Sequence, residues 1–425
     1  RNIIYFGEGT GERGGTFAHT KNLWTEFGPE RMVDTPISEL GFTGASLGAS
    51  ATGVRCIADL MFADFLFEAA GQIALQAAKL RYMSNGQMQA PMVIRVGSGA
   101  VRSAGPHHSG TYHPVWAHIP GMIVCMPSTP ADAKGLMKTA LRASDPVLVL
   151  EPKALFASRG PVPEGSHYVP FGVARIAREG SDLTIVSAGQ LVHRALEAAE
   201  ALAGEGISAE VIDLRTIQPL DVESVAASVR KTHRLLVVDE AYAMFGVGAE
   251  LAQSVNELAF DWLDAPVARL HSEPVTHPFA PALEREMLVN TDKIVAAARD
   301  LMKGIARPIA RMGAAGRPAV AAAPAPQAPR PSPATAAGAR RQPKWAGAAV
   351  AMPFGDLTVS SGKLVRWLKK VGDRVEAAEL VAEIETDKAV VEIEASDAGI
   401  LAEQLYQPGE TVEMGAVLAV VARKG

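Results

Sequence analysis

The chain has 425 residues, 48% of them hydrophobic, and a formal net charge of −5 at neutral pH. It is long enough to bury two or three cores, and its acidic balance argues against binding to nucleic acid. No apolar run is long enough to span a membrane, no signal peptide is visible, and the two cysteines form no disulfide framework, so we expect a cytoplasmic protein, or one of the mitochondrial matrix if eukaryotic.

The first part of the chain alternates apolar, strand-like runs with helical periodicity. Strands are expected at 2–6, 54–60, 91–96, 122–126 and 146–151, and helices at 65–82 and 131–143. This alternation predicts a parallel sheet covered by helices on both faces, a doubly wound α/β domain that we place at residues 1–165. Because the chain begins with Arg1 and almost directly with a strand, we expect the natural N-terminus to lie upstream.

A second alternation of the same kind follows. Strands are expected at 183–187, 209–213, 235–239 and 267–270, and helices at 192–203, 222–231, 248–260 and 291–303. It predicts a second doubly wound α/β domain at residues 166–303. Residues 304–348 are dominated by Ala, Pro and Arg and cannot form a core, so we expect a flexible linker there.

The C-terminal segment contains an internal repeat. Residues 362–384 and 399–421 match at a constant offset of 37, with Gly362 matching Gly399 and Gly372 matching Gly409. Two copies of one short β-unit predict a small all-β sandwich, placed at 349–425, because neither copy could bury its apolar face alone. Lys388 lies between the copies, in a predicted hairpin tip.

This segment resembles the lipoyl domain of 2-oxo acid dehydrogenase complexes. The resemblance rests on Met352-Pro353, on Glu385-Thr386-Asp387-Lys388-Ala389 and on Pro408-Gly409-Glu410. It implies covalent lipoate on Lys388, attached by a lipoate ligase. Biotin carriers usually place methionines beside their lysine, and Asp387 and Ala389 therefore favour lipoate. The alternative is that Lys388 is an ordinary solvated turn residue.

Several motifs in 1–303 occur together in one family. They are Asp34-Thr35-Pro36-Ile37-Ser38-Glu39, Phe62-Ala63-Asp64-Phe65, His107-His108-Ser109, Ala117-His118-Ile119-Pro120-Gly121 and Phe245-Gly246-Val247-Gly248-Ala249-Glu250. In this order they resemble the beta subunit of the thiamine-diphosphate-dependent decarboxylase component of pyruvate, branched-chain 2-oxo acid and acetoin dehydrogenase complexes. The resemblance implies a pyrimidine-binding domain followed by a transketolase-type C-terminal domain.

The resemblance assigns the central acid of the site to Glu39. A carboxylate hydrogen-bonded to the aminopyrimidine ring favours the imino tautomer, whose nitrogen then removes the proton from the thiazolium carbon. The alternative is that Glu39 only places a negative charge at the start of a helix.

Further site residues are carried over by position in the motifs. Phe65 is expected to stack on the aminopyrimidine, with Ile37 and Met61 as apolar neighbours and Glu8 as a nearby acid. His108 is expected to handle the substrate carboxylate and reductive acylation, which a side chain titrating near neutral pH suits. Phe62 and Phe67 are expected in the core.

The metal and diphosphate part of the site is not expected in this chain. Thiamine enzymes hold the diphosphate and Mg²⁺ with a Gly-Asp-Gly motif, which is absent from 1–303. An alpha partner, either a separate subunit or an upstream half of a fused chain, is therefore implied, in a heterotetramer or a dimer of fused chains. In some relatives carbonyls matching Ala140, Leu141, Ala143 and Asp145 bind potassium.

The combined reading is an enzyme subunit that carries its own lipoyl arm. The implied reaction is oxidative decarboxylation of pyruvate or a branched-chain 2-oxo acid, or cleavage of acetoin, with reductive acylation of the lipoyl group. Dihydrolipoamide acyltransferase and dihydrolipoamide dehydrogenase are the implied partners. The alternative is a non-catalytic carrier or scaffold subunit. The motifs leave the substrate open, and also whether the arm serves its own site.

Overall fold

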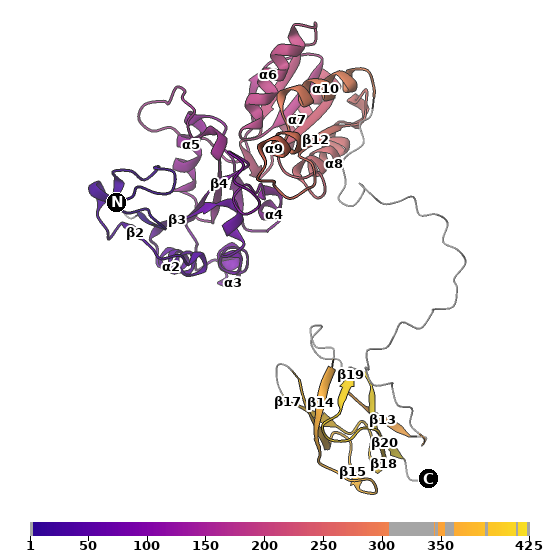
Figure 1. Ribbon diagram of the computed structural model, residues 1–425. Coiled ribbons are helices and arrows are strands. Elements are labelled where there is room, and N and C mark those ends of the chain that lie inside the picture. Colours follow the sequence, from indigo (N-terminus) through magenta and orange to yellow (C-terminus); the bar gives the residue numbers. More distant parts are fainter. Residues whose placement is uncertain are drawn as a thin grey trace. The chain divides into compact units, whose positions relative to one another are not determined.

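The computed structural model describes residues 3–305, 344, 347–352, 361–386, 390–413 and 415–422. The chain divides into two compact units, Arg1–Ala319 and Val320–Gly425, an α/β unit and an all-β unit (Figure 1). Most of the linker expected at 304–348 lies outside the described residues. Within the described part of the chain, no helix has both the length and the apolar character to cross a membrane.

The first sheet of the α/β unit has seven strands in the order β10-β5-β6-β4-β3-β1-β2. Six of these strands run parallel, as predicted, whereas β10 lies antiparallel to β5 and comes from the second half of the unit. The strands are β1 (Ile3–Gly7), β2 (Met32–Asp34), β3 (Arg55–Phe62), β4 (Met92–Ser98), β5 (Ile123–Cys125), β6 (Val147–Pro152) and β10 (Thr216–Gln218).

The prediction of one continuous helix at residues 65–82 is wrong. The stretch predicted as one helix at 65–82 consists of four short turns of different pitch. Leu66 and Ile73 of this stretch are fully buried. Gly71 weakens regular helix and begins a wider π-helical turn, which separates the stretch into pieces. The turns are η1 (Ala63–Leu66), η2 (Gly71–Gln76), η3 (Ala77–Lys79) and α3 (Leu80–Met83).

The remaining helices near this sheet are α1 (Leu23–Phe27), α2 (Glu39–Ala51), α4 (His113–Ala117), α5 (Pro130–Ala140) and the short η4 (Lys153–Leu155). Helix α2 packs against β1 and β3, and α5 packs against β6. Thr129 begins α5 by accepting a hydrogen bond from the Asp132 amide at 3.0 Å, and Pro130 occupies the first turn.

The second sheet has the order β12-β11-β8-β9-β7, in which only β7 is antiparallel to its neighbour. Its strands are β7 (Arg175–Arg178), β8 (Leu183–Ser187), β9 (Ala209–Asp213), β11 (Leu235–Asp239) and β12 (Ala268–His271). The helices are α6 (Leu191–Ala203), α7 (Val222–Thr232), α8 (Val247–Ala259), η5 (Phe260–Trp262), α9 (Pro281–Met287) and α10 (Thr291–Met302). The doubly wound prediction is confirmed, with an added antiparallel edge strand in each sheet.

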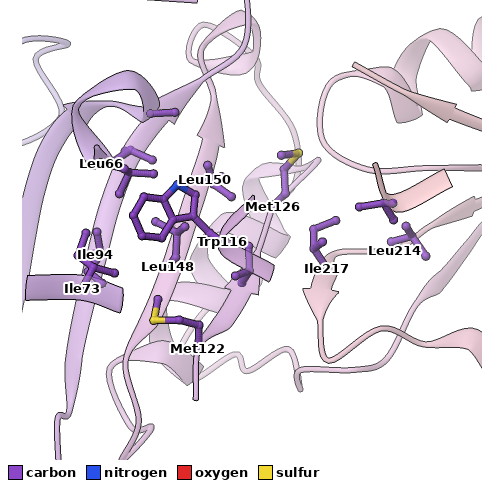
Figure 2. Close-up of a cluster of buried hydrophobic side chains, with 14 of the residues drawn as sticks. Leu66, Ile73, Ile94, Trp116, Met122, Met126, Leu148, Leu150, Leu214 and Ile217 are labelled. Carbon is purple, nitrogen blue, oxygen red and sulfur yellow. The ribbon is translucent and has the colours of Figure 1, made fainter. Parts of the chain in front are cut away.

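The two α/β halves share one hydrophobic core. Trp116 is 1% exposed and is surrounded by side chains of the first sheet and of η1 and η2, among them Leu148 and Ile94 (Figure 2). Leu214 and Ile217 of the second half belong to the same cluster. Full burial of one large apolar side chain stabilises a fold by about 1.5–3 kcal/mol. Because both halves contribute such side chains to one core, the core stabilises their association.

The all-β unit has two four-stranded antiparallel sheets, as predicted. One has the order β13-β20-β18-β15 and the other the order β17-β16-β14-β19. The strands are β13 (Ala348–Ala351), β14 (Ser361–Trp367), β15 (Arg374–Val375), β16 (Leu380–Glu385), β17 (Val390–Glu394), β18 (Gly399–Gln404), β19 (Thr411–Glu413) and β20 (Val417–Ala422).

The internal repeat appears in this unit as a pair of equivalent hydrogen bonds. The Gly372 amide donates to the Leu401 carbonyl at 2.8 Å, and the matching Gly409 amide donates to the Leu364 carbonyl at 2.7 Å. Both glycines have positive φ, 97° and 93°, which glycine adopts without steric cost. Each copy of the repeat thus donates an equivalent hydrogen bond to the other copy, as expected for two units related by a two-fold axis.

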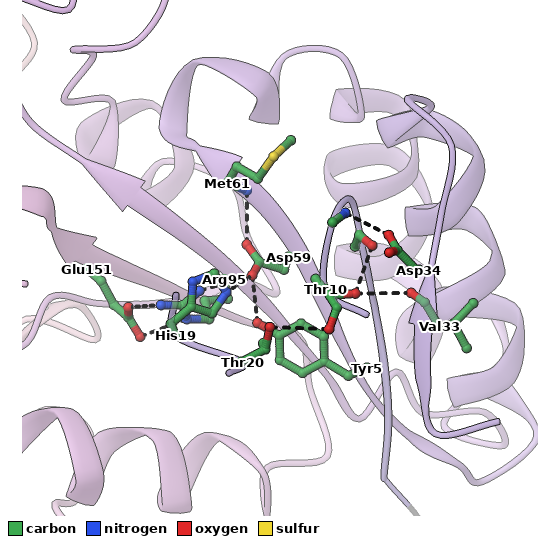
Figure 3. A network of polar contacts seen from close by, with 12 residues as sticks. Tyr5, Thr10, His19, Thr20, Val33, Asp34, Asp59, Met61, Arg95 and Glu151 are labelled. Carbon is green, nitrogen blue, oxygen red and sulfur yellow. Dashed lines mark hydrogen bonds and ion pairs between the residues drawn. The ribbon is translucent and has the colours of Figure 1, made fainter. Parts of the chain in front are cut away.

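A buried ionic network ties the segment after β1 to the sheet (Figure 3). Tyr5 Oη donates to Asp59 Oδ2 at 2.6 Å, Arg95 Nη1 donates to the same oxygen at 3.0 Å, and His19 Nε2 lies 2.5 Å from it. Arg95 also pairs with Glu151. Burial alone would raise the pKa of Asp59, but the His19 hydrogen bond and the Arg95 charge hold it at about 2.

The network predicts a pH-dependent loss of stability in Asp59→Asn. The pKa of Asp59 in the fold is about 2, below its value near 3.9 in an unfolded chain, so the carboxylate stabilises the fold above about pH 4. This stabilisation is lost as the pH falls towards 2. We expect urea unfolding to show a deficit of roughly 3 kcal/mol at pH 7 that shrinks below pH 4. The exposed Asp261→Asn is the control, and a pH-independent deficit would contradict the assignment.

Gly121 of the Ala117-His118-Ile119-Pro120-Gly121 motif has a structural role that can be tested. Its φ is +93°, and an added Cβ would lie 2.0 Å from the Ala78 carbonyl oxygen. Gly53 has nearly the same φ, +94°, with no atom within 4 Å of such a Cβ. We expect Gly53→Ala to cost about 1–2 kcal/mol of strain and Gly121→Ala to lower the unfolding free energy by clearly more. Equal losses in chemical denaturation would rule out the close contact.

Candidate active site

The predicted site residues follow strands that end at the same edge of the first sheet. Strand register pairs Gly7 with Asp59 and Phe62 with Gly97, which aligns the carboxyl ends of β1, β3 and β4. In open α/β sheets this edge is where ligands bind. Glu8, Phe65 and His108 follow β1, β3 and β4, Ile37 and Glu39 follow β2, whose Asp34 pairs with Gly7, and Met61 is the penultimate residue of β3.

Two of these residues form an acidic pair. Glu39 is the first residue of α2, and Glu8 follows β1 directly. The pKa of Glu8 is raised, first by burial and then by the charge of Glu39, so the two carboxylates lie close enough to interact. Glu8 Oε1 is buried and has no hydrogen-bond partner among the described residues. A buried oxygen of this kind is suited to a ligand that supplies a donor.

Ile37 lies just before this pair and is 83% exposed. An isoleucine is usually buried, and its exposure here leaves an apolar surface beside the acidic pair. The structure therefore places Ile37 where a ligand or another polypeptide could cover it.

Met61 has a left-handed backbone, with φ 61°. It lies at an irregularity in the register of β3 with β4, and its amide donates to Asp59 Oδ1 at 3.0 Å. A non-glycine residue in this conformation is strained and is often found at functional sites. The Asp59 network thus fixes both the segment after β1 and the backbone of Met61.

Phe62, Phe65 and His108 form an aromatic group. The Phe62 and His108 ring centroids are 4.6 Å apart at 87°, and those of Phe65 and His108 are 5.6 Å apart at 76°. All three side chains are partly exposed. The structure therefore brings the predicted Phe65 and His108 together. Phe62, expected in the core, faces His108 instead.

Phe67, also expected in the core, is 48% exposed. Its ring packs on Tyr112 and Trp116 with centroid distances of 4.9 and 5.9 Å. The periodicity could not reveal this because residues 63–83 do not form one continuous helix.

Lys153 is a residue of this edge that the sequence reasoning missed. It follows β6, is 5% exposed, and donates to the backbone carbonyl of His108. Burial lowers its pKa to about 8, against the charges of Asp64, Glu240 and Glu284. The sequence feature that could have identified Lys153 is its position, as a charged residue directly after a run of apolar residues.

The prediction of a potassium site at residues 140–145 remains untested. Two arginines already contact this turn. The Ala143 carbonyl accepts a hydrogen bond from Arg55 Nη1 at 2.8 Å, and Asp145 pairs with Arg81 at 2.6 Å. One predicted potassium ligand, the Ala143 carbonyl, is thus already bonded to the Arg55 guanidinium. Among the described residues, no cluster of three or more His, Cys, Asp or Glu could hold a metal.

A pocket of about 940 Å³ lies elsewhere, between α4, β10 and α8. Tyr112, His118, Tyr242 and Phe245 line it, and none of the predicted cofactor residues does. The predicted cofactor residues therefore lie outside this pocket.

Lys388 lies outside the described residues. Strands β16 and β17, which precede and follow it, pair antiparallel with Glu385 opposite Val390. The predicted lipoyl lysine thus falls in the connection between two paired strands.

Three family models match the chain. They are the transketolase pyrimidine-binding domain at 1–158, the transketolase C-terminal domain at 172–294 and the model called biotin-requiring enzyme at 350–421. Among solved structures, an inactive β4 tetramer of a split-gene transketolase aligns with a TM-score of 0.58 at 23% identity, over 71% of this chain and 92% of that chain, which shows the fold.

Curated relatives match along most of their length. The beta subunit of acetoin:2,6-dichlorophenolindophenol oxidoreductase from Cupriavidus necator is 46% identical over 68% of this chain and 86% of its own. The beta-2 subunit of the mitochondrial pyruvate dehydrogenase E1 component from Oryza sativa subsp. japonica is 43% identical, over 70% and 80%. The 2-oxoisovalerate dehydrogenase beta subunit from Bacillus subtilis is 41% identical, over 70% and 92%. This chain therefore belongs to the family of beta subunits of the acetoin, pyruvate and branched-chain 2-oxo acid dehydrogenases, joined to a C-terminal domain of the biotin/lipoyl type.

Proposed function

We propose that the chain is the beta part of a thiamine-diphosphate-dependent dehydrogenase that acts on a 2-oxo acid or on acetoin. Its edge site takes part in cleaving the substrate, and a lipoyl group on Lys388 accepts the acyl product. The observation that carries the proposal is the convergence of Glu8, Glu39 and the Phe65–His108 group at one edge of the sheet.

The residues at this edge fit the aminopyrimidine half of the cofactor. The ring needs a carboxylate acceptor and apolar contacts, and the edge offers Glu39, the unpartnered oxygen of Glu8 and the exposed Ile37. When bound, thiamine diphosphate supplies the electron sink for carbon–carbon bond cleavage. The chain lacks a Gly-Asp-Gly motif in 1–303, and we assign the diphosphate and Mg²⁺ to an alpha partner.

Each residue has a distinct task in this proposal. Glu39 accepts a hydrogen bond from the pyrimidine ring nitrogen, which sets the tautomer of the ring. Glu8 offers a second carboxyl beside Glu39, and burial and the charge of Glu39 raise the pKa of Glu8. The His108 imidazole can exchange a proton with the substrate, and Phe65 and Met61 provide the apolar wall.

The proposed reaction requires enzymes that load, unload and reoxidise the lipoyl group. A lipoate ligase attaches the cofactor at Lys388, a dihydrolipoamide acyltransferase receives the acyl group, and a dihydrolipoamide dehydrogenase reoxidises the dithiol. The alternative of a non-catalytic scaffold gives no reason for the unpartnered carboxylate oxygen of Glu8 or the strained backbone of Met61. Assays of the reconstituted enzyme with pyruvate, branched-chain 2-oxo acids and acetoin would identify the substrate.

Glu39→Gln should abolish thiamine-dependent turnover in the complex with the alpha partner. The amide keeps the size of the side chain but is a poorer acceptor, and loss of acid–base function typically lowers the rate by about 10²–10⁴-fold. The matched control is Glu223→Gln, because Glu223 is an exposed acid in the first turn of α7. Dye-linked steady-state assays at saturating thiamine diphosphate measure both variants. Activity of Glu39→Gln within threefold of the parent would reject the assignment.

Lys388→Ala should remove the covalent lipoyl group. Intact-mass spectrometry of protein produced together with a lipoate ligase is expected to show one lipoyl adduct, which disappears in this variant. Lys363→Ala is the control, because Lys363 is an exposed lysine on β14 of the same unit. An adduct that persists in Lys388→Ala would assign the modification to another residue.

A further inference from the structure

We propose that Lys153 is a positioning residue for His108, which its buried ammonium holds through both the backbone carbonyl and the supporting Phe62 ring. The inference rests on the proposed function only in taking His108 as a catalytic side chain. The family resemblance assigned no role to Lys153.

The segment that carries His108 has little regular structure of its own. It lies between β4 and α4, and it contains positive-φ residues at Gly99, Arg102, Ser103 and Gly105. The conformation of this segment is therefore set by hydrogen bonds to other elements and not by the hydrogen bonds of a helix or a sheet.

Three carboxylates hold this segment before and after His108, and the first is Glu240, whose Oε1 accepts from the Ala100 amide at 2.9 Å. Glu284 Oε2 accepts from the Ser103 amide and hydroxyl at 3.1 Å each, and Asp64 Oδ2 accepts from the Gly110 amide at 3.2 Å. Lys153 provides the anchor between them, at His108 itself.

The Lys153 ammonium contacts His108 by two routes. Nζ donates to the His108 carbonyl and also lies 5.0 Å from the centroid of the Phe62 ring. The same ring meets the His108 imidazole edge to face at 4.6 Å. One cation therefore sets the backbone position of His108 and the orientation of the ring that supports its imidazole.

Packing alone does not require a lysine here. Its stem fills the space left by Gly97, where an added Cβ would lie 2.9 Å from Lys153 Cγ and 3.0 Å from the Met61 carbonyl oxygen. A methionine of similar length would fill this space without burying a charge, but it would leave the His108 carbonyl without its donor. Burying the ammonium is costly for the fold, and its hydrogen bond to this carbonyl points to a role in positioning.

The test uses the assembled complex with its alpha partner and the variants Lys153→Met and Lys153→Arg. Lys153→Met is expected to lower kcat by roughly ten- to a hundredfold, as a small misplacement of a catalytic group does, while thiamine affinity stays unchanged and the melting temperature falls by only about 5 °C or less. Lys153→Arg keeps the charge and should recover part of the activity. An unchanged kcat, or a loss of thiamine affinity as large as the loss of kcat, would overturn the inference.

Lys138→Met is the matched control. Lys138 also donates to a backbone carbonyl, that of Gly165 at 3.2 Å, and also lies over an aromatic ring, that of Tyr168 at 5.8 Å, but it has no link to His108. This variant should retain the parental kcat. A loss equal to that of Lys153→Met would mean that removing any such lysine disturbs the enzyme.

A double-mutant cycle tests whether Lys153 acts through His108. In a His108→Ala background the further change Lys153→Met should lower kcat less than twofold, because the group being positioned is gone. Additive losses would overturn the inference. A readout independent of turnover is the rate at which diethylpyrocarbonate modifies His108 in cofactor-free protein, which should rise in Lys153→Met and stay unchanged in Lys138→Met.

The two proposals fail in different ways. If Glu39→Gln remains active, the proposed function is wrong whatever Lys153 does. If Glu39→Gln is inactive but Lys153→Met keeps its kcat and its His108 modification rate, only the positioning role is wrong. Should Lys153→Met not assemble, the cycle is run with Lys153→Gln, which keeps a donor but not the charge, with the same expected coupling.

Discussion

The common direction of the strands in the first sheet is the constraint on which the candidate site depends. Parallel strands end at the same edge, so residues far apart in the sequence are delivered to one place. Glu8 follows β1, Phe65 follows β3 and His108 follows β4, and the register of these strands aligns their ends. An antiparallel arrangement would divide these residues between opposite edges.

Buried charges then fix the segments that leave this edge. Asp59 ties the segment after β1 to the sheet and holds the amide of Met61, and Arg95 connects Asp59 with Glu151. Lys153 ties the segment that carries His108 to the sheet, as Asp59 ties the segment after β1. Each charge is costly to bury and is retained with several hydrogen-bonding or aromatic contacts, which favours defined geometry over stability alone.

The all-β unit meets a different demand. Its two repeated halves exchange short strands, so that β15 of the first copy pairs with β18 and β19 of the second pairs with β14. This exchange of strands buries one core between the copies, and β16 pairs antiparallel with β17. The proposed role of Lys388, as the carrier of a mobile acyl group, suits a residue presented by a small stable scaffold.

The sequence by itself determined the fold class, the repeat in the C-terminal unit and the motifs that led to Glu39, Phe65 and His108, because apolar periodicity and family motifs are local patterns. Strands β8, β9 and β11 match the predicted ranges residue for residue. Only the tertiary structure decided the breaks in the 63–83 stretch, the antiparallel edge strand β10, the exposure of Phe67 and the contact of Lys153 with His108. These features depend on which distant segments pack together, and spacing along the chain carries no information about such contacts.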